Sequence, residues 1–496
     1  MLPKPFASFN YTPHYPHPHQ PVTLDAAWTR PAHDASLPIV EYQWTLGDGT
    51  QACGQIVEHA YPRQGDYIVT LTVKDQAGNQ DSQTQVISVS LRNPDEFGLP
   101  VMGWNSYNFF GNYIEKPSEG KSAEEMIRET VDILAAYDMR EYGYRYVNLD
   151  YAWAADRRDQ DGCLVPNPEK FPSGMSALAS YIHSKGFKAG IYLTCGLDHY
   201  TWDHKQGSLG YEGIDALTIA RWGFDFLKYD YCTYPQWDTL NYRTQKQRDV
   251  PAEIVTMGEA LKATGRNIYY SLCEHGRSHP WTYAAPYAKM WRIAADIRDG
   301  MITDAEGMQF TFQAAIDSER YRISAPYQRP GAVNDPDFLV VGLHGRGSGG
   351  LTKNSCTCVQ YRANFSLWCL ASAPLLMGND FRCMDDFCLE TLRNREMIAI
   401  NQDALVKAAL RIHDDGDTNV FVKPLIDGYA VGLYNRSSET RQIGFKWRDL
   451  GLADETELYL RDLWKHQNLG IHRDSYSQQV APNDCVVIRL KEIVFA

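Results

Sequence analysis

The sequence lacks the long apolar runs and the excess of basic residues that mark membrane-spanning and nucleic-acid-binding proteins. Its 496 residues include 48 Lys and Arg against 61 Asp and Glu, which gives a formal net charge of −13. An acidic chain disfavours nucleic acid and anionic membranes as partners. No uninterrupted apolar run reaches the roughly 18 residues that a membrane helix needs. We therefore expect no nucleic-acid partner and no membrane span.

The cysteines lack the paired spacing of a zinc site. There are 11 of them, and Cys356 and Cys358 form one C-x-C pair with no second pair nearby. We interpret these cysteines as structural and predict neither a metal nor a cofactor. The first residues, Met-Leu-Pro-Lys-Pro, do not have the pattern of a signal peptide. This leaves two options open, a cytoplasmic protein or an exported one whose leader is not in this sequence.

The length predicts two to four domains, and 44% hydrophobic with 22% charged residues is a globular composition. Residues 6–91 show an all-β pattern, in which short alternating stretches are separated by turn signals such as Gly47-Asp48-Gly49. The alternating stretches are Ile39–Leu46, Tyr67–Val73 and Thr84–Val89. We expect one β-domain over residues 1–91, followed by a linker over 92–100 with the breakers Asn-Pro-Asp and Gly-Leu-Pro.

Specific motifs in this segment resemble the PKD domain, an immunoglobulin-like β-sandwich. They are Tyr42-Gln-Trp-Thr-Leu-Gly-Asp-Gly-Thr50, His59-Ala-Tyr61 and Gly65-Asp-Tyr-Ile-Val-Thr-Leu-Thr-Val-Lys-Asp75. Leu46 stands where the family usually has Phe. Such modules are typically attached to secreted or surface enzymes, so the resemblance implies a secreted, periplasmic or cell-surface protein. We interpret the module as a spacer or a docking surface.

Residues 101–405 alternate strand-like and helix-like units, which is the pattern of a parallel α/β fold. The candidate strands are Met102–Ser106, Tyr144–Asp150, Lys188–Leu193, Phe224–Asp230, Ile268–Glu274, Met290–Ala294, Phe338–Gly342 and Pro374–Met377. Ser122 and Glu125 predict a capping box at the start of the first helix. Eight strands favour a (β/α)8 TIM barrel, and the absence of a Gly-rich phosphate motif disfavours a nucleotide fold.

Residues 406–496 return to alternating polar and apolar positions and predict an antiparallel β-sandwich. The candidate strands are Asn419–Lys423, Tyr429–Tyr434, Arg441–Lys446 and Asp484–Leu490.

Acidic residues follow several of the predicted barrel strands, at the end where such barrels place their active sites. At or after such ends lie Asp150, Asp230, Glu274 and Asp296, with the cations Lys228 and Arg292 beside them. A fifth acid, Asp337, stands at the entrance of the predicted seventh strand. Two carboxylates suffice for glycosidic cleavage, but aspartates at strand ends also commonly cap the next helix. The residue pattern alone therefore leaves five acids and no chosen pair.

The barrel resembles glycoside hydrolase family 27, which contains α-galactosidases and α-N-acetylgalactosaminidases. The similarity spans almost all of residues 101–496, through motifs in the family's order. They include Gly103-Trp-Asn-Ser-Tyr-Asn108, Tyr146-Val-Asn-Leu-Asp150, Gly186-Phe-Lys-Ala-Gly-Ile-Tyr192, Trp222-Gly-Phe-Asp-Phe-Leu-Lys-Tyr-Asp230, Ser271-Leu-Cys-Glu274, Trp291-Arg-Ile-Ala-Ala-Asp296, Asn334-Asp-Pro-Asp337 and Asn401-Gln-Asp403.

This resemblance implies a retaining mechanism in which Asp230 is the nucleophile and Asp296 the acid/base. Such carboxyl groups stand roughly 5–5.5 Å apart across the sugar. The resemblance also implies substrate-binding roles for several neighbours. Lys228 and Arg292 bind sugar hydroxyls, Glu274 contacts a 2-hydroxyl, and Asp150, Tyr192 and Asp337 line the pocket.

Four departures from the family pattern fall on the part of the pocket that recognises the sugar. Tyr151 replaces a second acid after Asp150, Tyr107 replaces a tryptophan, His275 replaces a tryptophan after Glu274, and Trp202 lies in an altered Thr-Trp-Asp-His segment. We count all four among the substrate-binding residues.

These departures leave the sugar open. A terminal α-galactoside is the first expectation, within a carbohydrate substrate such as a galactoside-containing oligo- or polysaccharide. β-L-Arabinopyranoside and α-glucan are alternatives. A non-catalytic carbohydrate-binding protein is a different class, and it would have lost one of the two aspartates. The sequence predicts no particular oligomeric state.

Overall fold

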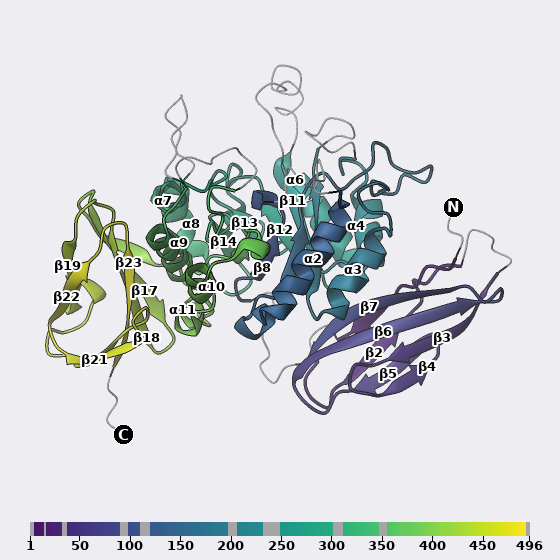
Figure 1. Cartoon of the computed structure of the whole chain (residues 1–496), viewed down its shortest axis with the longest axis horizontal. Coiled ribbons are helices and arrows are strands. Elements are labelled where there is room, and N and C mark those ends of the chain that lie inside the picture. The colour runs from purple at the N-terminus through teal and green to yellow at the C-terminus, as the bar shows by residue number, and fades with distance from the viewer. Residues whose placement is uncertain are drawn as a thin grey trace, which may run out of the picture. The chain divides into compact units, whose positions relative to one another are not determined.

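The computed structural model describes residues 4–13, 16–31, 37–89, 98–109, 120–196, 206–231, 249–300, 311–346 and 355–492 (Figure 1). The chain forms two compact units. The first contains Met1–Glu96, Gly111–Cys273 and Pro286–Ala288, and the second contains Phe97–Phe110, Glu274–Ala285 and Lys289–Ala496. Among the described residues, no helix is both long and apolar enough to cross a membrane.

The N-terminal domain of the first unit is the predicted β-sandwich. Its strands are β1 (Asn10–Thr12), β2 (Pro21–Asp25), β3 (Ile39–Thr45), β4 (Gln51–Cys53), β5 (Ile56–Ala60), β6 (Gly65–Asp75) and β7 (Gln80–Val89). They form two antiparallel sheets in the orders β1-β2-β5 and β4-β3-β6-β7. Alternate residues of β2 and β6 enter one core, where Phe9 lies edge-on to Trp44 with ring centroids 4.9 Å apart.

The central domain contains eight parallel strands, as the sequence predicts. They are β8 (Met102–Asn105), β9 (Tyr146–Leu149), β10 (Lys188–Thr194), β11 (Phe226–Asp230), β12 (Tyr269–Cys273), β13 (Met290–Arg292), β14 (Val333–Asp335) and β15 (Leu375–Met377). The sheet order is β14-β13-β12-β11-β10-β9-β8-β15. Every residue of β8, β9, β10 and β12 is buried, which explains their continuous apolar sequences.

Helices separate these strands along the chain. They are α2 (Ala123–Ala136), α3 (Met175–Ser184), α4 (Glu212–Trp222), α6 (Val250–Ala263), α7 (Phe312–Asp317), α8 (Glu319–Ser324), α9 (Cys358–Ala371), α10 (Asp386–Leu392) and α11 (Arg395–Asn401). The predicted capping box opens α2. Ser122 Oγ accepts from the Glu125 backbone N–H at 3.2 Å, and Glu125 accepts from the Ser122 N–H at 2.7 Å.

The predicted seventh strand, Phe338–Gly342, is wrong. The strand β14 lies earlier, at Val333–Asp335, and within Phe338–Gly342 only Leu339 forms a bridge, to Met377 of β15. Pro336 lacks a backbone N–H, and Asp337 has φ +107, so the extended conformation cannot continue past Asp335. Asp337 therefore follows the end of its strand instead of preceding its start.

The C-terminal domain is an antiparallel sandwich within the second unit. Its strands are β16 (Leu410–Asp414), β17 (Thr418–Leu425), β18 (Gly428–Asn435), β19 (Arg441–Lys446), β20 (Leu458–Asp462), β21 (Gln467–His472), β22 (Ser475–Val480) and β23 (Cys485–Glu492). Six of them form the sheet β16-β17-β18-β23-β20-β21, and β19 pairs with β22. Trp447 and Phe445 stack at 5.6 Å in the core between the sheets.

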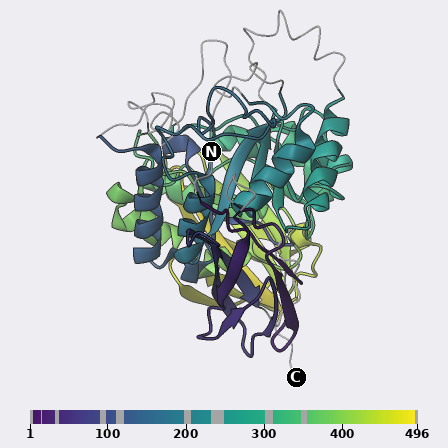
Figure 2. The same ribbon diagram turned by 90° about the vertical axis from the view of Figure 1, so that its right-hand side faces the viewer.

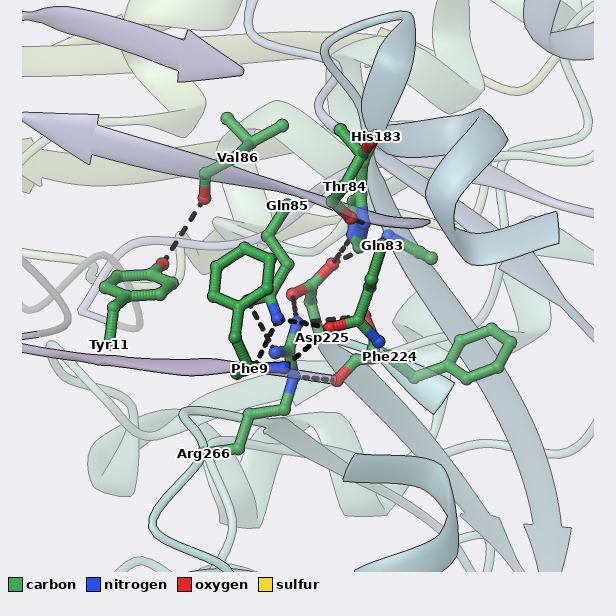
Figure 3. Close-up of polar contacts among 12 residues, drawn as sticks. Phe9, Tyr11, Gln83, Thr84, Gln85, Val86, His183, Phe224, Asp225 and Arg266 are labelled. Carbon is green, nitrogen blue, oxygen red and sulfur yellow. Dashed lines mark hydrogen bonds and ion pairs between the residues drawn. The ribbon is translucent and has the colours of Figure 1, made fainter. Parts of the chain in front are cut away.

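The N-terminal sandwich, purple in Figure 2, packs through β7 on α3 of the same unit. A polar network joins the two there (Figure 3). Asp225, directly before β11, pairs with His183 of α3 at 2.7 Å and with Arg266 at 2.5 Å. Arg266 also donates to Gln85 Oε1 of β7 at 2.6 Å, and His183 Nδ1 contacts the Thr84 carbonyl. The sandwich is therefore fixed to the edge of the sheet where these strands begin.

Candidate active site

The carboxyl ends of β9, β10 and β11 bring five predicted residues into one group, the lysine cluster: Asp150, Tyr151, Tyr192, Lys228 and Asp230. Lys228 Nζ donates to Asp150 Oδ2 at 2.9 Å and lies 5.4 Å from the centre of the Tyr192 ring. Both charged groups are almost fully buried, with side chains 9% and 2% exposed. Their pairing compensates for the burial of each charge.

Asp230 is the last residue of β11 and is less buried than the residues before it. The Tyr192 hydroxyl donates to Asp230 Oδ2 at 3.0 Å, and the Asp230 carbonyl accepts from the Cys195 N–H at 2.9 Å. Trp153 Nε1 donates to the Tyr192 carbonyl at 2.8 Å. Asp230 is thus a partly exposed carboxylate on a rigid strand end, the placement that a nucleophile requires.

The second unit gathers the remaining described residues into the arginine cluster: Tyr107, Glu274, His275, Arg292, Asp296 and Asp337. Three side chains surround the Asp296 carboxylate there. Arg292 Nη2 lies 3.1 Å from Oδ1, His275 Nε2 lies 3.5 Å from Oδ1, and the Tyr107 hydroxyl donates to Oδ2 at 3.3 Å. The Asp296 side chain is 32% exposed, so it is held in place while remaining open to solvent.

Asp337 holds Arg292 from the other side. Their ion pair measures 2.9 Å between Arg292 Nη1 and Asp337 Oδ1, and both side chains are 3% exposed. Asp337 Oδ2 accepts from the Ile297 N–H at 2.7 Å, and its carbonyl accepts from Trp368 Nε1 at 2.7 Å. Burial raises the pKa of Asp337, and the positive charge of Arg292 opposes that shift. These bonds fix a residue whose left-handed backbone is strained.

Glu274 is a buried acid with one free oxygen. Burial raises its pKa to about 7, and the backbone and side chain of Ser278 oppose the shift. Oε2 accepts from the Ser278 N–H at 2.7 Å, whereas Oε1 is buried without a hydrogen-bond partner among the described residues. A buried acceptor of this kind costs folding free energy, and a ligand that donates a hydrogen bond to it would remove that cost.

The structure places all the predicted site residues except Trp202, which lies outside the described residues. Tyr107 was predicted to bind substrate, and its hydroxyl in addition donates to the predicted acid/base, Asp296. The contacts of Cys195, Trp153 and Trp368 were not predicted, because each acts through a backbone group of a site residue. No local sequence signal marks that kind of contact.

Comparison with known proteins agrees with this architecture. The alpha galactosidase A family matches residues 99–403, the PKD domain matches 4–90, and the alpha galactosidase C-terminal beta sandwich domain matches 415–490. The α-galactosidase of Cyamopsis tetragonoloba is 38% identical over 387 residues, covering 78% of this chain and 84% of that protein. That of Coffea arabica is 40% identical over 368 residues, covering 74% and 87%.

Solved structures are similar as well. A Bacteroides fragilis protein, 32% identical, covers 99% of this chain and 98% of its own with a TM-score of 0.72. The α-galactosidase I of Mortierella vinacea, 29% identical, covers 81% of this chain and 99% of its own with a TM-score of 0.70. A family match over more than half of the chain, with relatives near 40% identity, shows that this glycosidase belongs to glycoside hydrolase family 27, the α-galactosidase family.

Proposed function

We propose that the protein is a retaining α-galactosidase that releases terminal α-D-galactose from oligo- or polysaccharides by double displacement. The observation that carries the proposal is the position of Asp230. It ends the strand β11 inside the family's Lys-Tyr-Asp motif, and it is oriented by the Tyr192 hydroxyl at 3.0 Å. Membership of the α-galactosidase family supports the choice of sugar.

In the first step, Asp230 attacks the anomeric carbon while Asp296 gives its proton to the leaving oxygen. In the second step, Asp296 takes a proton from water, which attacks the same carbon and releases Asp230. Arg292, His275 and Tyr107 all contact Asp296. These contacts hold the Asp296 carboxyl group in one orientation, which proton transfer in both steps requires.

The family resemblance assigns recognition of the sugar to buried polar groups. Asp150, which accepts from Lys228 Nζ and from the Tyr151 N–H, is assigned to sugar hydroxyls. Among the described residues, Glu274 Oε1 is a buried acceptor without a hydrogen-bond partner, and a 2-hydroxyl would satisfy it. A glutamate there favours galactose over N-acetylgalactosamine, because the family's N-acetyl-specific members have a small residue at this position.

Tyr151 favours a second candidate, a β-L-arabinopyranosidase. The tyrosine is 8% exposed and stands where the family usually carries a second acid that grips sugar hydroxyls. L-Arabinopyranose is galactose without C6. It therefore loses less binding free energy than galactose does when a phenol replaces that acid. A site built on hydrogen bonds discriminates strongly when one of them is absent, so the two sugars should be hydrolysed at clearly different rates.

A panel of p-nitrophenyl glycosides separates the candidates. We expect kcat/KM to be highest on the α-galactoside, ahead of the β-L-arabinopyranoside, α-N-acetylgalactosaminide and α-glucoside. A preference for the arabinoside would replace the first proposal by the second. Folded protein that hydrolyses none of the four would refute the exo-glycosidase proposal.

The roles of the two acids have their own test. Asp230→Ala should abolish turnover, and azide should restore it by forming a glycosyl azide of inverted configuration, since azide occupies the space of the missing carboxylate. Asp132→Ala, which alters an exposed aspartate of α2, is the control and should keep full activity. Proton NMR of the unaltered enzyme should show first a product of retained configuration, and an inverted first product would contradict the two-step mechanism.

We also propose a secreted, periplasmic or cell-surface location, because PKD-like modules typically accompany exported enzymes. Cell fractionation with an antibody against the chain tests it, and recovery in the cytoplasm alone would contradict it.

A further inference from the structure

Three side chains with metal-binding atoms meet in the second unit: His344, Asp385 and Cys388. One donor atom from each lies within 4.8 Å of the other two. His344 Nε2 is 2.6 Å from Asp385 Oδ2 and 3.8 Å from Cys388 Sγ. The sequence showed no such site, because the histidine stands 41 residues before the aspartate and the thiol lies outside the C-x-C pair.

The backbone around the three residues is held by other bonds. The His344 N–H donates to the Tyr361 hydroxyl at 2.7 Å, and its ring lies edge-on to Tyr361 at 5.4 Å. The Gly345 N–H donates to Asp299 at 2.6 Å. Asp385 caps α10 by accepting from the Cys388 N–H at 2.8 Å. These bonds anchor the backbone that carries the three donor side chains.

The charges around the cluster favour a cation. Within the described part of the chain, the one ion-pair partner of Asp385 is His344. Besides His344, the groups that act electrostatically on the Cys388 thiol include Asp385, Cys358 and Asp299, each of which becomes negative when it ionises. The hydrogen bond between His344 and Asp385 does not explain why the Cys388 thiol also lies against the same ring nitrogen of His344. A metal ion uses all three donors.

We propose that His344, Asp385 and Cys388 bind a zinc ion. Nitrogen, oxygen and thiolate ligands are the set that zinc takes, at about 2.0–2.3 Å. Tetrahedral geometry then separates the donor atoms by roughly 3.3–3.7 Å. The histidine–aspartate distance must widen to reach this range, and the histidine–thiol distance is already close to it. The His344 and Asp385 side chains are 29% and 40% exposed, so the ion can enter from solvent and keep a water as fourth ligand.

The ion would have a structural role. Cys388 and Asp385 belong to the start of α10, and His344 belongs to the loop after Leu339. A shared ion would join these two segments. The hydrogen bond between His344 and Asp385 already links them. Metal bound to the folded state alone raises the stability of that state by mass action.

The test uses the full-length protein, reduced with a non-chelating phosphine and dialysed against metal-free buffer. After one equivalent of Zn²⁺ is added, competition with a chromophoric chelator measures the affinity. We expect one tight equivalent per chain and a rise in the thermal midpoint. Co²⁺ in place of Zn²⁺ should show the near-ultraviolet absorption of a thiolate ligand.

Cys388→Ser should remove the thiolate absorption and weaken zinc binding by more than about 100-fold, beyond the 10–100-fold that loss of a supporting group costs. His344→Gln should weaken binding similarly. The matched control is Cys383→Ser, because Cys383 is an exposed thiol five residues before Cys388 and should leave affinity, absorption and midpoint unchanged.

Three outcomes would overturn the proposal. One is folded, reduced protein that retains no zinc, and another is equal binding by Cys388→Ser and the unaltered chain. The third is a mass spectrum in which Cys388 and Cys358 are joined as a disulfide in the protein as isolated. All three are read from metal content, absorption or mass, so they do not depend on whether the protein is an α-galactosidase.

Discussion

Lys423 should cost the protein stability at neutral pH, and replacing it should recover that stability. The lysine lies on β17 and is fully buried. Its Nζ contacts the Ser372 hydroxyl and the Cys369 carbonyl at the end of α9. Both partners are neutral, and among the described residues no carboxylate lies within ion-pair distance of Lys423. Burial lowers the pKa of Lys423 to about 7.

The size and sign of the effect follow from this shift. An amine of ordinary pKa 10.5 that titrates at about 7 in the folded state costs at most about 5 kcal/mol when the unfolded chain is protonated. Between pH 7 and 10.5 the unfolded state binds more protons, so the free energy of unfolding rises with pH in that window. Lys423→Met removes the cost, but it loses two hydrogen bonds worth about 1 kcal/mol each. The net gain at pH 7 is therefore about 2–3 kcal/mol, and it disappears near pH 9, where the remaining cost of the lysine equals the value of the two hydrogen bonds.

Thermal unfolding followed by circular dichroism from pH 6 to pH 10 measures this difference. A gain of that size should raise the midpoint of the second unit by roughly 5–10 °C at pH 7, and the two midpoints should converge as the pH rises. Lys446→Met is the matched control, because Lys446 is an exposed lysine of the same domain and should change the midpoint little at any pH. A variant less stable than the parent at pH 7, or a gap that does not depend on pH, would refute the reasoning.

Three further predictions concern the domain contact and the site. Arg266→Met should lower the free energy of unfolding by about 3 kcal/mol, because it breaks a buried ion pair. Arg145→Met removes the more exposed pair of the same contact and should lower the free energy of unfolding by less than about 1 kcal/mol. Thermal unfolding of the two variants measures the difference. Tyr107→Phe should lower kcat/KM on the preferred substrate about 10-fold through loss of one hydrogen bond to Asp296, and an unchanged value would contradict that role. Burial raises the pKa of Glu274 from 4.5 to about 7, so the free energy of unfolding falls as pH rises from 4.5 to 7. Glu274→Gln removes this loss and should stabilise the fold by up to about 3 kcal/mol at pH 8. The same substitution should raise KM. A Glu274→Gln variant that is stabilised as much at pH 4 as at pH 8 would contradict the raised pKa of Glu274.

The fold was predictable where burial makes a strand apolar throughout. The predicted strands Lys188–Leu193 and Ile268–Glu274 differ from β10 and β12 by one residue at each mismatched end. Prediction failed where conformation overrides hydrophobicity. Phe338–Gly342 is as apolar as a strand, but the strained backbone of Asp337 moves the strand to the residues before it. Apolar pattern alone cannot distinguish these cases.

The residues themselves predicted where the candidate site lies but not which two acids act in it. Strand ends and residue types narrowed the choice to five acids, and the family motifs, not the local chemistry, selected Asp230 and Asp296. Contacts between distant parts of the chain carry no local signal. The hydroxyl of Tyr107 reaches a carboxylate 189 residues away, and His344 meets a thiol 44 residues away, that of Cys388. Such contacts follow from three-dimensional packing, which a periodic pattern does not encode.

The contact between the N-terminal module and the barrel is also long-range and has no local sequence signal. The motifs of the module predict a β-sandwich but not the barrel strand that it contacts. The structure attaches it to β11 through Asp225, at the start of the strand, and β11 ends five residues later at Asp230. In barrels of this type the strand starts contribute stability and the strand ends carry chemistry. The module therefore supports the start of the strand that carries the proposed nucleophile at its other end. Weakening this contact should change how long the enzyme stays folded more than it changes which sugar it selects.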